Sequence, residues 1–533
     1  MLQRFFLPVV LAVAWSSTAS AVPGPDSVAV IANQNVPESV ALARAYVEAR
    51  QVPENQLCLL DVEDTVDLTL EAFRTDVRDP LMDCLANAGV LTRIEAVLIV
   101  RGIPLRVTVP TPAGNRRVSL AAALGVWTSE DGNPILGAPP GNGVPYAARW
   151  RNPYRSLAFE PGWSANVDGV EWRLMLVTML HGDSYEEARL LLDSAVDAEA
   201  MGGARGQFLF MNGADSARGV RDADYPRVIA GLEARGFTDV ERVGFDANLT
   251  GRTLASFFVG TANLGDTIEG NTFLPGALVD NLTSFGAVPP NFDPDADDQQ
   301  VSIARWVRRG VGGVHGTTDE PLNNCFPSRQ LLLEYVDGST LAEAFHRRMP
   351  FVYWRNLVLG DPMLAPYAIR PEVSVEGVAD GDTIPEGSSI TVQATDSEGI
   401  GVDSVAVYLD GVEVDRTDGD RLEVALPLAD GETAELLLVA QKRDDRSDRG
   451  LHRPKGWTLL ELRGGPPMVA MPDAAVDAGP DAAVDAMPMP MDAAVDATVA
   501  SDDDGCSAGG KMPIEPLGAA AFIALLLRRR RKR

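Results

Sequence analysis

The stretch Ser27-Val28-Ala29-Val30-Ile31-Ala32-Asn33 decides the fold, because it is a continuous apolar run that ends in a polar residue. The next segment, 37–50, has a proline in its first turn and apolar residues at helical spacing. Similar runs and helical patterns alternate along the chain, at 57–62, 96–100, 185–201, 208–211 and 225–235. Strands without polar alternation are buried on both faces, and their alternation with helices is typical of parallel sheets. The pattern predicts an α/β domain over 22–370, with a mostly parallel sheet and helices on both faces.

Polar residues follow several of these apolar runs. In open α/β sheets, ligands bind beyond the carboxyl ends of the strands. This rule selects Asn33 and Arg101 as candidate binding residues, and it places Asn35 and Asn212 at comparable positions.

The period of the pattern changes after residue 370. Short apolar strands separated by Asp/Gly turns such as 380–382 and 410–411 predict a small β-sandwich over 371–463. The segment resembles the immunoglobulin-like modules of many bacterial surface proteins, although it lacks their Cys…Trp…Cys core. The resemblance implies a spacer or stalk, with carbohydrate binding as the alternative.

The N-terminus has the three parts of a secretory signal peptide. Arg4 supplies the positive region, 5–15 is apolar, and Ala19-Ser20-Ala21 fits the small-x-small cleavage rule. We therefore expect residues 1–21 to be removed by signal peptidase after Ala21, and the protein to be exported.

Residues 464–504 predict a disordered tether. The motif Asp-Ala-Ala-Val-Asp-Ala begins at Asp473, Asp481 and Asp492, and Lys and Arg are absent between Met468 and Asp504. A segment with uniform negative charge and few large apolar groups buries too little surface to fold.

The final segment, 505–533, has a lone Cys506, an apolar run at 517–527 and a basic end at 528–533. It resembles the MYXO-CTERM sorting signal of myxobacterial surface proteins. The resemblance implies a membrane contact, a sorting protease that cuts near Cys506, and display at the cell surface or outer membrane of a Gram-negative bacterium. The alternative is a C-terminal transmembrane helix, which the length disfavours because the apolar run is shorter than the ~20 residues that a span needs.

Charge and cysteine usage exclude several classes of function. The net charge of −29 argues against nucleic acid and anionic lipid as partners, because both require basic patches. A disulfide between Cys58 and Cys84 is one of two open possibilities, and the other leaves both as thiols. The sequence has neither a CxxC nor an HExxH motif, so we nominate no metal ligand and leave the cofactor unknown.

Three blocks between 274 and 362 carry the most specific sequence. They are Leu-Pro-Gly-Ala-Leu-Val-Asp-Asn-Leu-Thr-Ser-Phe-Gly at 274–286, a glycine-rich block at 310–316, and Gly-Asp-Pro at 360–362. These blocks resemble an uncharacterised family of secreted bacterial α/β proteins, for which the resemblance implies no activity. Their order is also distantly similar to gingipain-type peptidases of the caspase-like fold. Those enzymes need a catalytic His-Gly and Cys, whereas 283–285 reads Thr-Ser-Phe and the nearest upstream His-Gly is the distant pair 181–182.

The candidate catalytic residues are His315, Asp319, Glu320 and Cys325. A histidine near a cysteine can activate a thiol, and a histidine beside two carboxylates can do acid–base work or bind a metal. The structural alternative is that His315 caps a strand end and Cys325 packs in the core.

Two further residues, Asp280 and Ser284, are candidate binding residues that share a helix face if that stretch is helical. Asp361 is expected to hold its own backbone in a turn. Two functions remain open: a hydrolase-like domain, in the form of a degenerate caspase-like peptidase, or a non-catalytic surface binding or adhesion module.

Overall fold

The computed structural model describes residues 23–110, 114–126, 152, 164–167, 170–293, 300–443 and 453–467. The predicted signal peptide with Ala21, most of the tether and the tail with Cys506 lie outside these residues. All described residues belong to one compact unit of the chain. Within them, no helix has the length and hydropathy required to cross a membrane.

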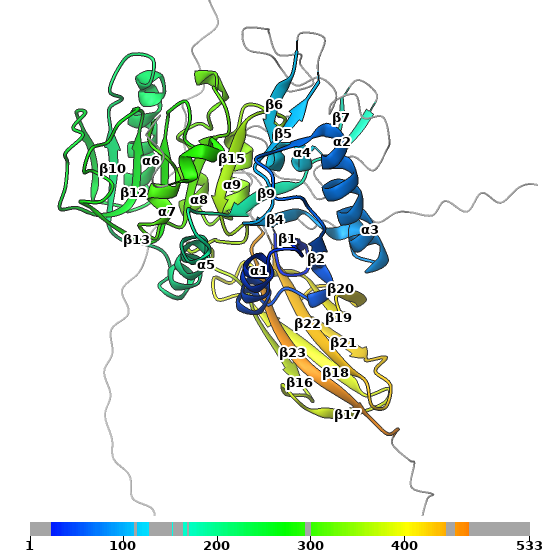
Figure 1. Ribbon diagram of the computed structural model, residues 1–533. Helices are drawn as coiled ribbons and strands as arrows, with labels where there is room; N and C mark the ends of the chain where they lie inside the picture. Colours follow the sequence, from blue (N-terminus) through cyan, green and yellow to red (C-terminus); the bar gives the residue numbers. More distant parts are fainter. Residues whose placement is uncertain are drawn as a thin grey trace, which may run out of the picture. The chain divides into compact units, whose positions relative to one another are not determined.

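A ten-stranded sheet forms the centre of the α/β part (Figure 1). Its first half is parallel and contains β1 (Val28–Asn33), β2 (Leu57–Leu60), β4 (Ala96–Val100), β9 (Leu176–Leu180) and β15 (Asn356–Gly360). Its second half is also parallel and contains β10 (Gln207–Met211), β11 (Val240–Val243), β12 (Thr253–Val259), β13 (Thr272–Asn281) and β14 (Gly313–Thr317). The sequence prediction of a mixed α/β fold with a mostly parallel sheet is confirmed.

The two halves meet at β14 and β15, which pair antiparallel. One residue pair, Leu359 with Met179, joins β15 to β9. Asp183, after β9, and Ala262, after β12, line one pocket, so the carboxyl ends of these two strands lie at the same edge of the sheet. The sequence did not predict the antiparallel pairing of β14 and β15, because apolar runs indicate burial and not direction.

Helices cover the buried strands. All residues of β1, β4 and β9 are buried, as expected for strands that are packed on both faces. Helices α1 and α5 contact each other, and α8 contacts both α6 and α9. The helices are α1 (Pro37–Arg50), α2 (Leu70–Ala72), α3 (Asp79–Asn87), α4 (Leu120–Gly125), α5 (Tyr185–Ala200), α6 (Tyr225–Glu233), α7 (Ala304–Val307), α8 (Leu331–Val336) and α9 (Leu341–Arg348).

Shorter elements complete this part of the chain. A small sheet contains β3 (Asp67–Thr69), β5 (Arg106–Val109) and β6 (Arg116–Ser119), and β7 (Ser164–Val167) pairs with β8 (Val170–Arg173). Short 3-10 helices occur at Glu54–Gln56, Leu91–Arg93, Gly219–Asp224, Pro289–Phe292 and Asn323–Cys325, and a π-helix occurs at Phe73–Arg78.

Asp361 fixes the end of β15 to α1. Its carboxylate accepts a 2.7 Å hydrogen bond from the Tyr46 hydroxyl and a 2.9 Å bond from the Met363 N–H. The Nε of Arg50 lies 2.9 Å from the same carboxylate, and Arg50 also pairs with Glu199 of α5 at 2.8 Å. The predicted turn role is confirmed, and the buried network extends it to two helices.

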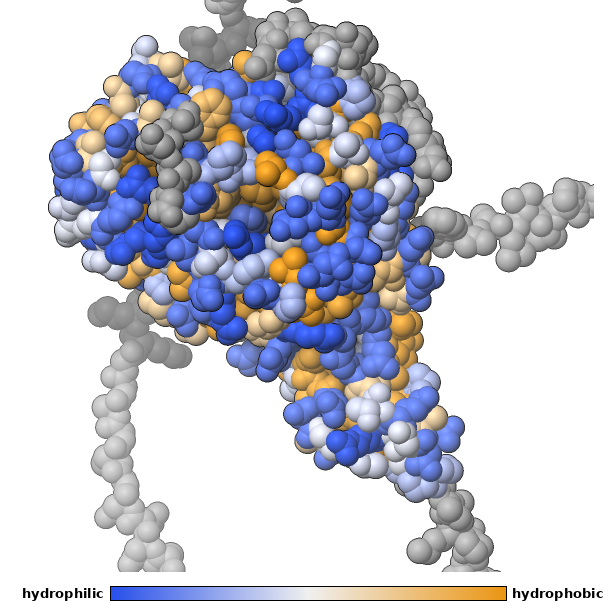
Figure 2. Space-filling model, viewed as in Figure 1, coloured by the Kyte–Doolittle hydropathy of each residue, from blue (hydrophilic) through white to orange (hydrophobic). Residues whose placement is uncertain are grey.

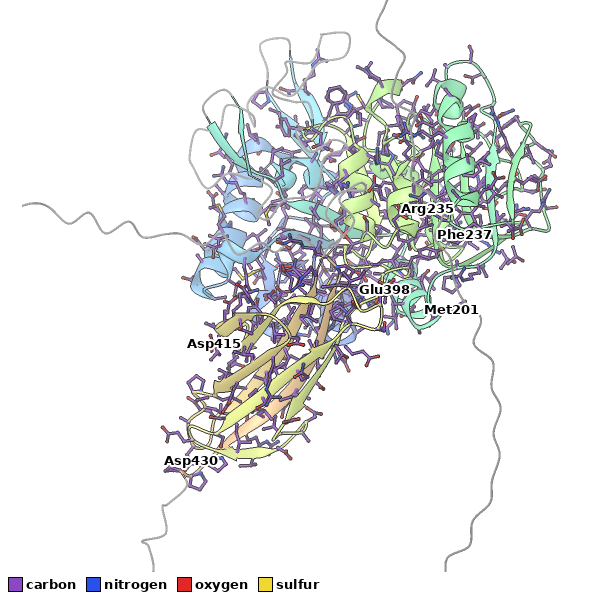
Figure 3. All side chains as sticks on the ribbon, turned by 180° about the vertical axis from the view of Figure 1, so that it is seen from behind. Met201, Arg235, Phe237, Glu398, Asp415 and Asp430 are labelled. Carbon is purple, nitrogen blue, oxygen red and sulfur yellow. A yellow bond between two sulfur atoms is a disulfide. The ribbon has the colours of Figure 1, made fainter. Side chains whose placement is uncertain are left out.

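The predicted β-sandwich consists of two mainly antiparallel sheets that share one core. One sheet contains β16 (Glu372–Glu376), β18 (Ser389–Thr395) and β21 (Arg421–Ala425). The other contains β17 (Thr383–Pro385), β19 (Val402–Leu409), β20 (Val412–Asp418), β22 (Thr433–Lys442) and β23 (Lys455–Gly465). Glu398 and Asp430 lie in turns at opposite ends of the sandwich (Figure 3).

A buried ion pair joins the sandwich to the α/β part. The ammonium of Lys455, at the start of β23, lies 2.9 Å from the carboxylate of Asp26. The guanidinium of Arg93 stacks over the ring of Tyr408, 5.0 Å from its centroid. These contacts give the two parts a shared interface.

The disulfide that the sequence left open is present between Cys58 of β2 and Cys84 of α3. Hydrophilic side chains dominate the face of the molecule in Figure 2, as expected for a strongly acidic chain in water.

Candidate functional site

A cleft of about 580 Å³ opens beyond the carboxyl ends of β4 and β9. Arg101 and His181, which directly follow these strands, line it together with Tyr185 of α5. Phe292, which follows β13 in the other half of the sheet, lines it as well. The volume lies within the range of small-molecule sites.

Arg101 is half-buried in this cleft. Its guanidinium stacks over the Tyr185 ring, 5.3 Å from the centroid, and donates a hydrogen bond to the Gly182 carbonyl. Burial lowers the pKa of Arg101, although arginine remains charged at neutral pH. No carboxylate among the described residues forms an ion pair with it.

His181 is a buried neutral histidine. Only 8% of its surface is exposed, and its ring contacts the Phe292 ring edge-on at 4.5 Å between centroids. Burial, with a further contribution from the Arg101 charge, lowers the pKa of His181 to about 3. Its Nδ1 has no hydrogen-bond partner among the described residues. The cleft thus has a buried neutral imidazole in its wall, next to the Gly182 backbone.

Three carboxylate residues, Asp64, Asp183 and Asp293, belong to the polar lining. Asp183 forms an ion pair with Arg308, whose charge neutralises it. Asp64 is exposed at the rim of the cleft.

Asn33, the other predicted strand-end residue, is fully buried and lies outside the cleft lining. Its amide donates hydrogen bonds of 2.8 and 2.9 Å to the carbonyls of Val62 and Gly102. Gly102 has a φ of 108°, and a Cβ there would lie 2.9 Å from Ser39. Asn33 therefore holds the loop that presents Arg101 and does not itself face a ligand.

The predicted catalytic residue His315 lies in the core, in β14. Its Nδ1 lies 3.2 Å from Oδ1 of Asp280 on the neighbouring strand β13, and its Nε2 lies 3.1 Å from Oδ1 of Asn356. The Asn356 amide nitrogen donates to the Cys325 carbonyl at 3.2 Å, which fixes the orientation of its oxygen. Both ring nitrogens of His315 thus face oxygen acceptors, and neither faces a thiol.

Two arginines complete this buried cluster. Arg221 and Arg329 donate to Oδ2 of Asp280 at 2.6 and 2.7 Å. Burial alone would raise the pKa of Asp280, but the two guanidiniums hold it well below its usual range. Burial and the neighbouring Arg329 charge lower the pKa of Arg221 to about 10.

The structure divides the predicted site residues into two groups. His315, Cys325 and Asp280 are fully buried, so a substrate reaches none of them without opening of the fold. Ser284 and Glu320 lie nearer the surface, where the Ser284 hydroxyl donates to Glu320 at 3.0 Å.

Asp319 is partly exposed and lies 3.4 Å from the Arg355 guanidinium. Asp280 and Ser284 do not share a helix face, because residues 272–281 form strand β13. Across the described ranges, no cluster of three or more His, Cys, Asp or Glu side chains has the arrangement of a metal site.

Sequence reasoning missed His181, although a signal was present. The apolar run at 176–180 ends directly before it, so the strand-end rule selects it in the same way as Arg101. The His-Gly pair was instead considered only in the comparison with gingipain-type peptidases, where it lies too far upstream.

No family model matches the chain, and neither does any curated protein sequence. Among solved structures, fibronectin(III)-like modules of CbhA from Clostridium thermocellum are 14% identical over 21% of this chain and 52% of that chain, with a TM-score of 0.14. This chain therefore spans about half the length of that structure. The spore cortex lytic enzyme SleM from Clostridium perfringens is 9% identical over 70% of this chain and 92% of its own, also with a TM-score of 0.14. Similarities at these TM-scores carry no argument about fold or function.

Proposed function

We propose that this protein is an exported, surface-displayed module that binds a small polar ligand in the cleft beyond β4 and β9. One observation carries this proposal: Arg101, which forms no ion pair with a carboxylate among the described residues, and the buried His181 line the same cleft. A positioned charge and a buried polar group between apolar walls are the usual features of a ligand site.

Export and display are parts of the same proposal. They rest on the signal-like segment 1–21, the acidic tether 464–504 and the sorting-type tail 505–533. The proposed processing partners are a signal peptidase at Ala21 and a sorting protease near Cys506. The immunoglobulin-like sandwich joins the binding domain to the tether.

A hydrolase-like domain of degenerate caspase or gingipain type is the second candidate. The Asp280–His315 contact favours it, because a carboxylate beside an imidazole orients the base in nucleophilic enzymes. Its weakness is geometric: the other ring nitrogen of His315 is occupied by Asn356, and the cluster is buried. Labelling of Cys325 by a thiol-directed activity probe, lost in His315→Ala, would support this candidate.

The binding proposal is tested by thermal-shift screening of the purified mature chain against a panel of sugars, amino acids, dipeptides and organic acids. We expect a ligand that raises the melting temperature of wild type but not of Arg101→Gln. The matched control is Arg227→Gln, which changes an exposed arginine on α6. A panel whose effects are all independent of Arg101 would contradict the proposal.

A further inference from the structure

The charges of the cleft restrict the class of ligand. Arg101 is a half-buried cation with no carboxylate in ion-pair distance among the described residues. A planar guanidinium pairs with a carboxylate through two parallel hydrogen bonds. The Tyr185 ring below it and the Gly182 carbonyl beside it hold the orientation of that guanidinium. The arrangement fits a ligand carboxylate.

The acidic surroundings disfavour a ligand that carries only negative charge. Asp64 lies at the rim, and its charge, like those of Glu186 and Glu187, acts on Arg101. Asp183 adds little because Arg308 neutralises it. A ligand with both a carboxylate and an ammonium satisfies the arginine and complements the rim, whereas a simple anion is repelled by it.

The walls between the charged groups are apolar. Ile103 and Leu105, from the loop after β4, and Phe292, from the other half of the sheet, line the cleft. All three side chains are largely buried, so they form a fixed surface. Such walls suit the side chain of an apolar residue placed between two charged ends.

Resting on the proposed binding function, we propose that the ligand of this cleft is a zwitterion, an amino acid or short peptide, whose terminal carboxylate pairs with Arg101. The ligand ammonium lies toward Asp64, and an apolar side chain contacts Ile103 and Phe292.

The test is isothermal titration calorimetry of the mature chain with the dipeptide L-alanyl-L-leucine. Its N-acetylated and C-amidated forms are titrated in parallel. We expect the free dipeptide to bind, and either blocked form to bind at least about tenfold more weakly, because each lacks one charge-assisted interaction. In Arg101→Gln, the C-amidated and the free dipeptide should bind with equal affinity. In Asp64→Asn, the N-acetylated and the free dipeptide should bind with equal affinity. Arg227→Gln should change neither.

The possible results separate this inference from the proposed function. Equal binding of the amidated and free dipeptides to wild type would overturn the carboxylate assignment. An Arg101-dependent thermal shift with another ligand class, without binding of any amino acid or dipeptide, would overturn the zwitterion assignment and leave the binding function standing. Dipeptide binding that is unchanged in both Arg101→Gln and Asp64→Asn would overturn the placement in this cleft.

Discussion

His315 and Asp280 lie on adjacent strands at the centre of the sheet, with Nδ1 and Oδ1 3.2 Å apart and neither side chain exposed. This pair belongs to a cluster that also contains Arg221 and Arg329, so one carboxylate faces two permanent cations and an imidazole. The cluster joins β13 and β14 to the segments before α6 and α8. We interpret its role as structural, and the cleft around Arg101 as the ligand site.

Asp280→Asn should destabilise the fold strongly. Loss of the carboxylate leaves two buried guanidiniums without their counter-charge, and removing one partner of a buried ion pair typically costs about 3–5 kcal/mol. Urea denaturation followed by circular dichroism measures the change in the free energy of unfolding. Asp197→Asn, at an exposed position on α5, should change it by less than ~0.5 kcal/mol. Similar stabilities for the two variants would contradict the structural role of the cluster.

The stability of the protein should depend on pH through His346. Its Nδ1 lies 2.8 Å from the Ala342 carbonyl, and its Nε2 accepts a 3.3 Å hydrogen bond from the Val177 N–H, which fixes the neutral ring. Burial is the main cause that lowers the pKa of His346 to about 4. Below its unfolded pKa of ~6.5 the unfolded chain binds a proton that the folded chain does not. This contribution is therefore complete above about pH 6.5 and is lost as the pH falls toward 4.

The comparison of wild type with His346→Gln isolates this group from other titrations. The difference in unfolding free energy between pH 7 and pH 4 should be about 3 kcal/mol larger for wild type, which corresponds to the lowering of the pKa. Chemical denaturation at several pH values measures it. Parallel pH profiles for the two proteins would show that His346 does not carry the effect.

Lys455→Met should weaken the interface between the sandwich and the α/β part. The substitution leaves the Asp26 carboxylate buried without its ammonium partner, so we expect a loss of about 3 kcal/mol. Thermal unfolding and limited proteolysis measure the loss. Arg463→Met is the matched control, because Arg463 lies on the same strand with 63% of its side chain exposed. Equal melting temperatures for the two variants would argue against a structured interface.

The Cys58–Cys84 disulfide should be present in the purified protein and should stabilise it. Closing a loop of this size typically contributes about 2–4 kcal/mol, so Cys58→Ser with Cys84→Ser should lower the stability by that amount. Peptide mapping without reduction detects the bond directly. The buried Cys325 should react with alkylating reagents only after unfolding. Rapid alkylation of Cys58 in the native protein would contradict the assignment.

Local patterns predicted the features that depend on neighbouring residues. The apolar run 27–33 has no polar alternation, and it forms the buried strand β1 beside β2 and β4. Arg101 was found because it directly follows an apolar run, and its place in the cleft is a consequence of that position. The Asp/Gly turns predicted the sandwich in the same way.

Contacts between segments that are far apart along the chain could not be predicted from the sequence. The pairing of Asp280 with His315 depends on the register of two strands, and the contributions of Arg221 and Arg329 depend on where two loops pass. The sequence grouped His315 with Asp319 and Glu320 by proximity along the chain. In the structure, His315 lies within strand β14 and is buried. Asp319 and Glu320 follow the end of that strand at Thr317 and are partly or fully exposed.

The most direct test of the account is a crystal structure of the mature chain with bound L-alanyl-L-leucine. We predict the dipeptide in the cleft between Arg101 and Phe292, with its carboxylate within hydrogen-bond distance of the Arg101 guanidinium and the His315 cluster unchanged. A dipeptide bound elsewhere, or a His315 cluster opened to hold it, would contradict the account.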